Sequence, residues 1–429
     1  MNPRRGNIYF LVLAVCLLVG MIGLGAVLAA RAQIRSVGQT ADFDEARLYA
    51  RSGIELGTWL ANQSNFRNTY SNGSWIARQK LGSGVLSISG NNVNPALPLN
   101  NSDTDPVVVT AIGYKGIAVH ETQVQLVAKP QALTCLPTCA DFGGGVTLGA
   151  LLSTVTLTCN QPFSTNGNLS AVQANMTGPL EYAGSLSIGL LCSGSFTTTH
   201  IAPRGLPDPN HVFDYYKSHG TPIAISSLYS ASLGGYAIQN CLLSPGNNPF
   251  GPTDPQGIYI VDCGSLGNTI TIQNCRIVGT LVILNAGAGS SVAGSVNWAP
   301  AVSNYPCLLV QSAIGSSFAL QYTNAAISES SIGVNLNPPS TPYNGISNTT
   351  TTDAYPSVIA GLVYCSGALS VANYVTIKGV LVVNGGLTWT SGTMSLTWDN
   401  LYSHNPPPGF YQTPVPMVVV SGSLAQVVN

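Results

Sequence analysis

The segment Asn7-Ile-Tyr-Phe-Leu-Val-Leu-Ala-Val-Cys-Leu-Leu-Val-Gly-Met-Ile-Gly-Leu-Gly-Ala-Val-Leu-Ala-Ala30 contains no charged residue, and arginines lie on both sides of it, with Arg5 before and Arg31 after. A helix of this length matches or slightly exceeds the roughly 30 Å hydrocarbon core of a bilayer. Lipid offers no partners for backbone N–H and C=O groups, so a helix is the state we expect. The sequence therefore predicts a single-pass protein of an inner or cell membrane, with a periplasmic or extracellular ectodomain.

Charged residues are scarce and unevenly distributed along the 429-residue chain. They make up 7% of the residues, and residues 1–80 hold nine of the 15 Lys and Arg. Typical globular domains have about 25% charged residues. Because phosphate neutralisation needs clustered cations, an ectodomain so poor in Lys and Arg excludes nucleic acid as a partner. The 46 glycines, 27 prolines and 45% hydrophobic residues indicate instead a folded, turn-rich β protein.

The ten cysteines show no metal-binding pattern. No CxxC pair and no His/Cys cluster occurs, so we expect no metal site and no cofactor. An exported ectodomain can form disulfides, and Cys135 and Cys139 are the closest local pair for one. The alternative is that the cysteines are small buried residues. The sequence leaves both interpretations open.

Three interpretations fit the N-terminus: a cleaved secretory signal, a plain signal anchor, or a prepilin leader. The apolar run is longer than the roughly 7–15 residues of a cleaved signal, and its length suits an anchor. Met1-Asn-Pro-Arg-Arg-Gly6, followed at once by the apolar segment, is similar to a prepilin leader. That resemblance implies cleavage after Gly6, which would leave Asn7 as the first mature residue.

The segment that follows the apolar run strengthens this resemblance. Residues 33–57 resemble the N-terminal segment of PilX-type minor pilins and K-type minor pseudopilins, in which a basic and acidic patch precedes an "AxxAGxE" stretch. The matching residues here are Ala46, Ala50, Ser52, Gly53 and Glu55. The likeness covers about the first 60 residues. It implies a role in type IV pilus or type II secretion assembly or in surface interaction, with other pilin or pseudopilin subunits as partners.

One position departs from the pattern of major pilins, which carry Glu at the fifth mature residue. Cleavage after Gly6 places Leu11 there. The missing carboxylate would normally neutralise the terminal ammonium of a neighbouring subunit inside an apolar environment, where an unpaired charge is costly. The resemblance therefore implies a place at a filament tip, or outside a filament, rather than in its repeating shaft.

Apolar residues, most of them small, form one stripe along the helix beyond the membrane. They recur at spacings of three and four, as expected for one face of a helix, and comprise Phe43, Ala46, Ala50, Gly53, Gly57 and Leu60. Such a stripe lets another backbone approach closely. It fits either a helix packed on its own ectodomain or a surface that packs in a filament. Both interpretations remain open, and each can hold along part of the helix.

Two segments beyond the helix predict a hairpin. Residues 106–114 and 117–128 are rich in β-branched residues and are separated by Lys115-Gly116. In the second segment, His120 and Glu121 fall on opposite faces of a strand, so they do not form a catalytic pair. The hairpin is similar to the small antiparallel sheet that packs on the helix in pilin-like proteins.

Short repeats dominate the chain after Pro130. Ile238-Gln-Asn-Cys241 recurs as Ile272-Gln-Asn-Cys275, and residues 270–285 resemble residues 369–384. Short β-branched strands that end in Asn or Gly, repeated without helices between them, are typical of a parallel β-helix. An antiparallel sandwich is the alternative fold.

One segment interrupts the β pattern. Asp208 followed by Pro209 predicts the start of a short capping helix near residues 208–217. Asp208, His211 and Asp214 also form the densest polar cluster of the ectodomain. A catalytic pair of carboxylates on a β-helix would indicate a polysaccharide hydrolase or lyase. We expect a structural role and no enzyme. The alternative is a membrane-anchored carbohydrate-binding or carbohydrate-active β-helix protein, with a surface polysaccharide as partner.

The sequence thus predicts a mainly β protein with a long N-terminal transmembrane helix, a small antiparallel sheet and a parallel β-helix-like solenoid. Five parts are expected: a leader at residues 1–6, a membrane-spanning and protruding helix at 7–62, a small β region at 63–132, a solenoid at 133–403, and a Pro-rich tail with a strand at 404–429.

Overall fold

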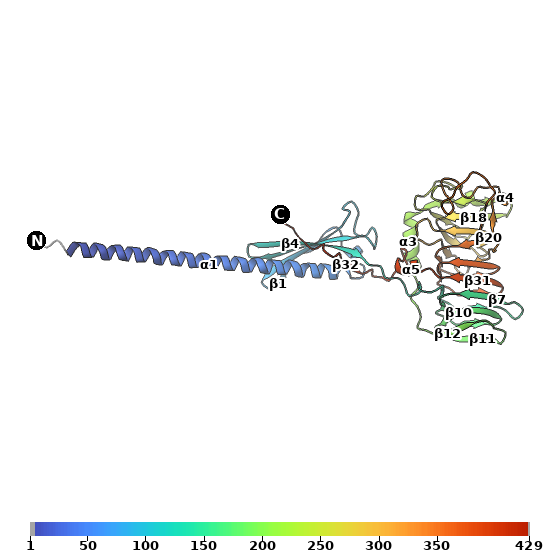
Figure 1. Ribbon diagram of the computed structural model, residues 1–429, viewed down its shortest axis with the longest axis horizontal. Helices are drawn as coiled ribbons and strands as arrows, with labels where there is room; N and C mark the ends of the chain where they lie inside the picture. Colours follow the sequence, from blue (N-terminus) through green and yellow to red (C-terminus); the bar gives the residue numbers. More distant parts are fainter. Residues whose placement is uncertain (1–4, 428–429) are drawn as a thin grey trace. The chain divides into compact units, whose positions relative to one another are not determined.

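The computed structural model describes residues 5–427, with side chains from Ile8 onward. Most of the expected leader, residues 1–4, and the side chain of Asn7 at the expected cleavage site therefore lie outside the described residues. The chain divides into two compact units, Met1–Pro130 with Thr413–Asn429, and Gln131–Gln412. The predicted fold class is confirmed: a long N-terminal apolar helix, a small antiparallel sheet and a large parallel sheet (Figure 1).

The first unit combines one long helix with an antiparallel sheet. Its helices are α1 (Arg5–Ala61) and the short α2 (Phe66–Thr69). Its strands are β1 (Gly73–Leu81), β2 (Gly84–Asn92), β3 (Val107–Lys115), β4 (Ala118–Ala128), β32 (Met417–Val419) and β33 (Ala425–Val427). The expected hairpin is β3 and β4, and in β4 the side chains of His120, Thr122, Val124 and Leu126 are buried, as the alternation predicts.

The small-residue stripe places the last third of α1 against this sheet. Ala46 and Ala50 are fully buried, and Leu60 is buried as well. A Cβ atom at Gly53 would lie 2.7 Å from Cβ of Ala111, and one at Gly57 would lie 2.6 Å from Cγ1 of Val109. Since real Cβ atoms do not approach so closely, glycine at both positions lets the helix and β3 touch.

The C-terminal residues return to the first unit, which corrects the expected division at residue 404. The solenoid unit continues to Gln412. Thereafter β32 and β33 both pair antiparallel with β4, and Asn62 at the end of α1 donates to O and accepts from N of Met417. Residues 413–427 therefore complete the small sheet, and the second unit is an insertion between β4 and β32.

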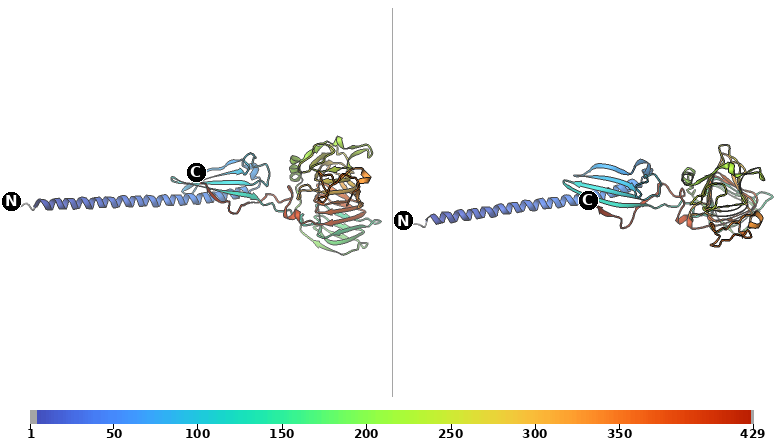
Figure 2. Two further views of the ribbon diagram at one scale, coloured as in Figure 1. Left: turned by 45° about the horizontal axis from the view of Figure 1, so that its top comes forward. Right: turned by 90° about the horizontal axis from the view of Figure 1, so that it is seen from above.

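The second unit is a parallel β-helix in which 25 strands form one sheet that winds round three faces. The turns lie over one another when the unit is seen along its axis (Figure 2, right). In stacking order, the first face contains β13 (Thr221–Ile223), β17 (Ile258–Asp262), β19 (Thr280–Ala286), β21 (Leu308–Ser312), β26 (Val363–Cys365), β29 (Leu381–Val383), β5 (Ala140–Phe142), β8 (Phe163–Thr165), β10 (Ala174–Tyr182) and β12 (Phe196–His200).

The other two faces follow the same stacking order. The second face contains β15 (Gly235–Gln239), β18 (Ile270–Val278), β20 (Ser291–Ala299), β22 (Ser317–Leu320), β27 (Ala368–Val371), β30 (Leu387–Trp389), β6 (Val146–Leu148), β9 (Leu169–Ala171) and β11 (Leu186–Ile188). The third face contains β16 (Leu242–Leu243), the ends of β18 and β20, β25 (Val358–Ile359), β28 (Tyr374–Lys378), β31 (Gly392–Thr397), β7 (Val155–Cys159) and the start of β10.

Short elements complete the unit. They are α3 (Pro209–His219), η1 (Ile225–Leu228), β14 (Tyr229–Ser230), β23 (Ile327–Ser328), α4 (Glu329–Ile332), β24 (Ala354–Tyr355) and α5 (Leu401–His404). Apart from β14 with β15, every pairing within the 25-stranded sheet is parallel in the described part of the chain, so the antiparallel sandwich is not formed.

The turns do not stack in sequence order. The chain begins the solenoid at β5 in the middle, winds to one end at β12, passes through α3 to the other end at β13, and winds back. Its last turn then pairs with its first, β29 with β5, β30 with β6 and β31 with β7. In Figure 1 this seam is visible where the red β31 lies beside the blue-green β7. Both ends of the insertion therefore lie at the middle of the stack.

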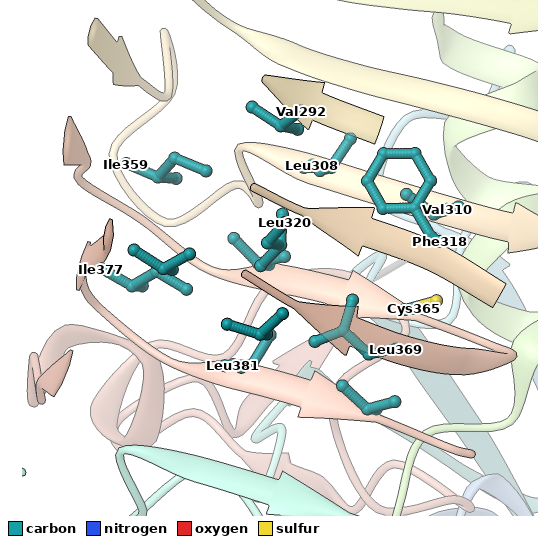
Figure 3. Packing of buried hydrophobic residues seen from close by; sticks show 14 of the residues in the cluster. Val292, Leu308, Val310, Phe318, Leu320, Ile359, Cys365, Leu369, Ile377 and Leu381 are labelled. Atoms are coloured by element: carbon teal, nitrogen blue, oxygen red, sulfur yellow. The ribbon is translucent and has the colours of Figure 1, made fainter. Parts of the chain in front are cut away.

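Apolar residues fill the interior of the solenoid in columns. Leu308, Val363, Leu381 and Ala140 follow one another on neighbouring turns of the first face, and all are buried. Figure 3 shows the inward side chains, including Phe318 and Leu369, packed between successive turns. Each turn thus buries its apolar residues on the turns above and below it.

The two sequence repeats occupy equivalent places in the stack. Ile238 pairs directly with Ile272, and the amide of Gln273 donates to that of Gln239 at 3.1 Å. The asparagines that follow, Asn240 and Asn274, both adopt the left-handed conformation with φ of 49° and 50°. Asn373, from the block that resembles residues 270–285, has φ of 59°. Asparagine tolerates this conformation, so it marks the corner between the second and third faces.

Helix α3 was expected to cap the solenoid, but it lies along its side. Val212, Phe213 and Tyr216 are fully buried against outward residues of the first face, such as Val282 and Tyr364. Helix α3 runs along the side of the stack in Figure 1, between the two ends that it connects. It covers an apolar side of the solenoid because it carries the chain from one end to the other.

The expected disulfide between Cys135 and Cys139 is not formed. Among the described residues every cysteine is a free thiol. Cys139 packs in the interior of the solenoid, whereas Cys135 belongs to the outer cluster beneath α3. The two side chains therefore lie on opposite sides of the strand wall. Burial raises the pKa of both thiols.

Candidate functional site in the long helix

The first part of α1 is exposed throughout. Every side chain from Ile8 to Ala41 is exposed in the structure, including large apolar ones such as Phe10 (78%) and Leu24 (63%). This part is about 50 Å long at 1.5 Å per residue. By length and composition α1 can cross a membrane. Such a surface needs lipid or other apolar helices around it, because water does not solvate it favourably.

Glycines give the apolar segment room for a close neighbour. A Cβ atom at Gly20, Gly23 or Gly25 would meet no described atom within 4 Å. Small residues at helix surfaces in lipid allow two backbones to approach and are enriched where such helices associate. The geometry therefore leaves room for another helix beside this segment.

A polar cluster fixes the helix where it leaves the exposed part. Nζ of Lys115 lies 2.6 Å from Oε2 of Glu45, and Ser83 and Tyr49 also hydrogen-bond to that carboxylate. The hydrogen bond and charge of Lys115 lower the pKa of Glu45, and those of Glu45 raise the pKa of Lys115. The cluster joins α1 to the turns β1–β2 and β3–β4, so the free part of the helix begins from a fixed base.

The structure divides the predicted stripe between two roles. Ala46, Ala50, Gly53, Gly57 and Leu60 face the sheet of their own unit. Phe43 remains 45% exposed, and its ring makes an edge contact with His120, with centroids 5.6 Å apart. The part of α1 that remains exposed is therefore the part before Phe43, which the periodicity of the stripe did not single out.

The three residues of the alternative polar site make separate contacts in the structure. Asp208 caps α3, and its Oδ1 accepts from N of Asn210 at 3.0 Å. Asp214 is 73% exposed and forms an ion pair with Lys217 at 3.4 Å. The His211 ring contacts Tyr411 edge-on at 5.5 Å. In residues 5–427 no group of three or more His, Cys, Asp or Glu side chains could hold a metal ion.

A buried carboxylate on the first face of the solenoid forms an ion pair that the sequence did not indicate. Asp141 on β5 is fully buried, and Arg204 Nε lies 3.6 Å from its Oδ2. The same guanidinium donates to Glu181 at 2.6 Å and to O of Thr134 at 2.9 Å. Burial raises the pKa of Asp141 to about 7. Arg204 thus ties the segment before α3 to two turns of the solenoid. No spacing in the sequence indicated this pairing.

Hydroxyl groups form a column on the second face of the solenoid. Ser370, Thr388, Thr147, Ser170 and Ser187 occupy the same outward position on successive turns. Neighbouring members are about 4.8 Å apart, the spacing of paired strands. A cavity of about 400 Å³ lies beside three of them, Thr388, Thr147 and Ser170, and is also lined by Gly145.

No family model and no curated protein matches the chain. Among solved structures the chain is similar to the competence-associated pilin ComZ from Thermus thermophilus. The identity is 8%, the match covers 93% of this chain and 96% of the other, and the TM-score is 0.28. Overlap at this level does not establish a shared fold.

Proposed function

We propose that this chain is a membrane-anchored, pilin-like subunit, a minor pilin or pseudopilin that acts in type IV pilus or type II secretion assembly or in surface interaction. The observation that carries the proposal is the division of α1. The part before Phe43 is mostly apolar and exposed, and the part after it packs on an antiparallel sheet of six strands. Such a helix can rest in the membrane and later pack against the helices of other subunits.

Two features favour a minor over a major subunit. Leu11 occupies the position at which major pilins carry Glu, so cleavage after Gly6 would leave the new ammonium without that partner. The residues inserted between β4 and β32 outnumber those of the unit that carries them. A body of that size suits a subunit that displays a surface rather than one repeated along a shaft.

Processing and co-purification test the proposal together. Surface fibres sheared from cells that assemble them should carry the protein, and its mature N-terminus should be methylated Asn7. Gly6→Leu should abolish cleavage and incorporation. Gly235→Leu is the matched control in the second unit, where a Cβ atom meets no described atom within 4 Å, and it should leave cleavage and incorporation unchanged. Unprocessed protein that is absent from sheared fibres in wild-type cells would overturn the proposal.

A second candidate function is contact with a surface polysaccharide. The hydroxyl column of the second face and its cavity favour it, because hydroxyl groups spaced at about 4.8 Å can exchange hydrogen bonds with an extended glycan. Retention on insoluble cell-surface polysaccharide should fall for the double variant Thr147→Val and Thr388→Val. It should not fall for Thr397→Val, an exposed threonine on the third face. Equal retention of all three proteins would exclude this function.

A further inference from the structure

A small cavity lies in the first unit between α1 and the strands β4 and β33. Its volume is about 170 Å³, and Arg47, Arg51, His120 and Thr122 line it together with Leu424–Gln426. Strand β33 forms one wall because Gln426 pairs with Thr122. The return of the chain after the solenoid therefore builds a hollow that the helix and hairpin alone would lack.

Two guanidinium groups contribute the charge of this cavity. Arg47 and Arg51 are one helical turn apart on α1, so their side chains lie on the same face of the helix. The sequence places Asp44 and Glu55 at suitable spacing for ion pairs with them, yet neither arginine forms a salt bridge within the described part of the chain. Both cations are thus unneutralised and line the same hollow.

The third polar group is a buried imidazole. The side chain of His120 is only 5% exposed, and its Nδ1 has no hydrogen-bond partner among the described residues. A buried polar atom without a partner is costly, and native proteins usually satisfy it with protein, water or a ligand. Burial, with a smaller contribution from the charge of Arg47, lowers the pKa of His120. Since a neutral imidazole can carry its proton on either nitrogen, Nδ1 can donate into the cavity.

We propose that Arg47, Arg51 and His120 form a binding site for an oxyanion, a carboxylate or phosphate group of small size. Guanidinium groups donate planar pairs of hydrogen bonds that match both anions. Bound there, the anion neutralises the two arginines and accepts a hydrogen bond from Nδ1 of His120. The site is independent of the proposed pilin-like function, since it needs only the first unit.

Geometry disfavours a lipid headgroup as the source. Arg47 lies 16 residues beyond Arg31, the first charge after the apolar segment, which is about 24 Å along a helix. The remaining sources are an acidic side chain of another protein and a free phosphate ion. Both sources offer oxygen atoms that accept hydrogen bonds from guanidinium groups, and one probe for each source distinguishes between them.

Calorimetric titration of the full chain in dodecyl maltoside, a detergent without charge, tests the site. The probes are inorganic phosphate and N-acetyl-aspartate amide, in a chloride buffer. Either probe should bind, and the double variant Arg47→Gln and Arg51→Gln should weaken it at least tenfold. The double variant Arg31→Gln and Arg35→Gln removes an equal charge from the exposed part of the same helix and should leave the affinity unchanged.

The NMR signal of histidine provides the second readout. The ring resonances of His120, assigned from the His120→Asn variant, should shift on titration, whereas those of the four other histidines should not. Tighter binding of the aspartate probe would identify a protein carboxylate as the ligand, and tighter binding of phosphate a free ion. If neither probe binds, or if the double arginine variant binds as the wild type does, the site does not exist.

Discussion

The backbone N–H of Gln412 donates a hydrogen bond to the carbonyl oxygen of Gln131 at 2.8 Å, so the two residues that bound the second unit are neighbours. Ala132 and Tyr411 extend this contact as an antiparallel bridge. An insertion whose ends lie together leaves the host unit little disturbed.

The contact between Gln131 and Gln412 predicts that the first unit folds without the insertion. A chain with Pro130 joined to Thr413 through a short Gly-Ser linker should keep its helix and sheet, because β32 and β33 still pair with β4. Hydrogen exchange of the β4 amides should show protection close to that of the full chain. A chain that also lacks residues 413–427 should lose that protection, and equal protection in both would contradict the assigned pairing.

Close packing of α1 on β3 predicts a size limit at Gly57. The variant Gly57→Leu should lower the free energy of unfolding of the first unit by about 1–3 kcal/mol, because its side chain would overlap Val109. The matched control is Gly38→Leu on the same helix, where a Cβ atom meets no described atom within 4 Å. Thermal unfolding in detergent should separate the two variants. Equal stability would contradict the helix–sheet contact.

Replacement of Asp208 should destabilise the protein more than replacement of Asp214, and neither replacement should change catalytic activity. Asp208→Ala removes a helix N-cap and should cost about 0.5–2 kcal/mol. Asp214→Ala removes only an exposed ion pair and should change stability by less than about 1 kcal/mol. Neither change should affect any polysaccharide turnover. Loss of turnover in either variant would favour the carbohydrate-active alternative.

Burial of Asp141 predicts a pH dependence. Its pKa rises from an ordinary 3.8 to about 7, so the folded chain holds this proton more strongly than the unfolded chain does. The resulting stabilisation is present below about pH 4 and is lost as the pH rises through 7. Asp141→Asn should therefore lose less stability than the wild type between pH 5 and pH 8, measured as Tm. Asp214→Asn, at an exposed position, should follow the wild type.

Buried thiols predict slow labelling of the solenoid. Burial raises the pKa of Cys159, Cys241 and Cys263 to about 12, so little thiolate forms at neutral pH. Of the solenoid cysteines only Cys192 is partly exposed. Among the solenoid cysteines a maleimide should modify Cys192 first in the native protein, and it should modify all ten cysteines of the chain after denaturation without reductant. Fewer than ten thiols would indicate a disulfide.

Local patterns predicted the elements well. The Ile-Gln-Asn-Cys repeats indicated the solenoid because each turn repeats the same inward residues and the same left-handed corner, as at Asn240 and Asn274. The spacing of small residues likewise predicted a helix face that another backbone could approach, and Gly53 and Gly57 lie there.

Long-range order was beyond such patterns. Sequence repeats indicate that turns of the solenoid stack, but they do not indicate which turn lies beside which. The pairing of β29 with β5 therefore had no signal in the local sequence. The strands β32 and β33 are only three residues each, and their partner β4 lies far back in the sequence. The pairing of Arg204 with Asp141 and the cavity beside His120 depend on that same long-range order.

The seam in the middle of the solenoid has a consequence for biosynthesis. As the polypeptide is synthesised, the turn at residues 140–159 exposes one unpaired edge until residues 381–397 arrive to cover it. If synthesis stops or a protease cleaves the chain before residue 381, the solenoid remains incomplete and keeps an unpaired strand edge. Unpaired edges pair readily with strands of other chains. Chaperone binding or rapid synthesis of the last turn would therefore protect this polypeptide from aggregation.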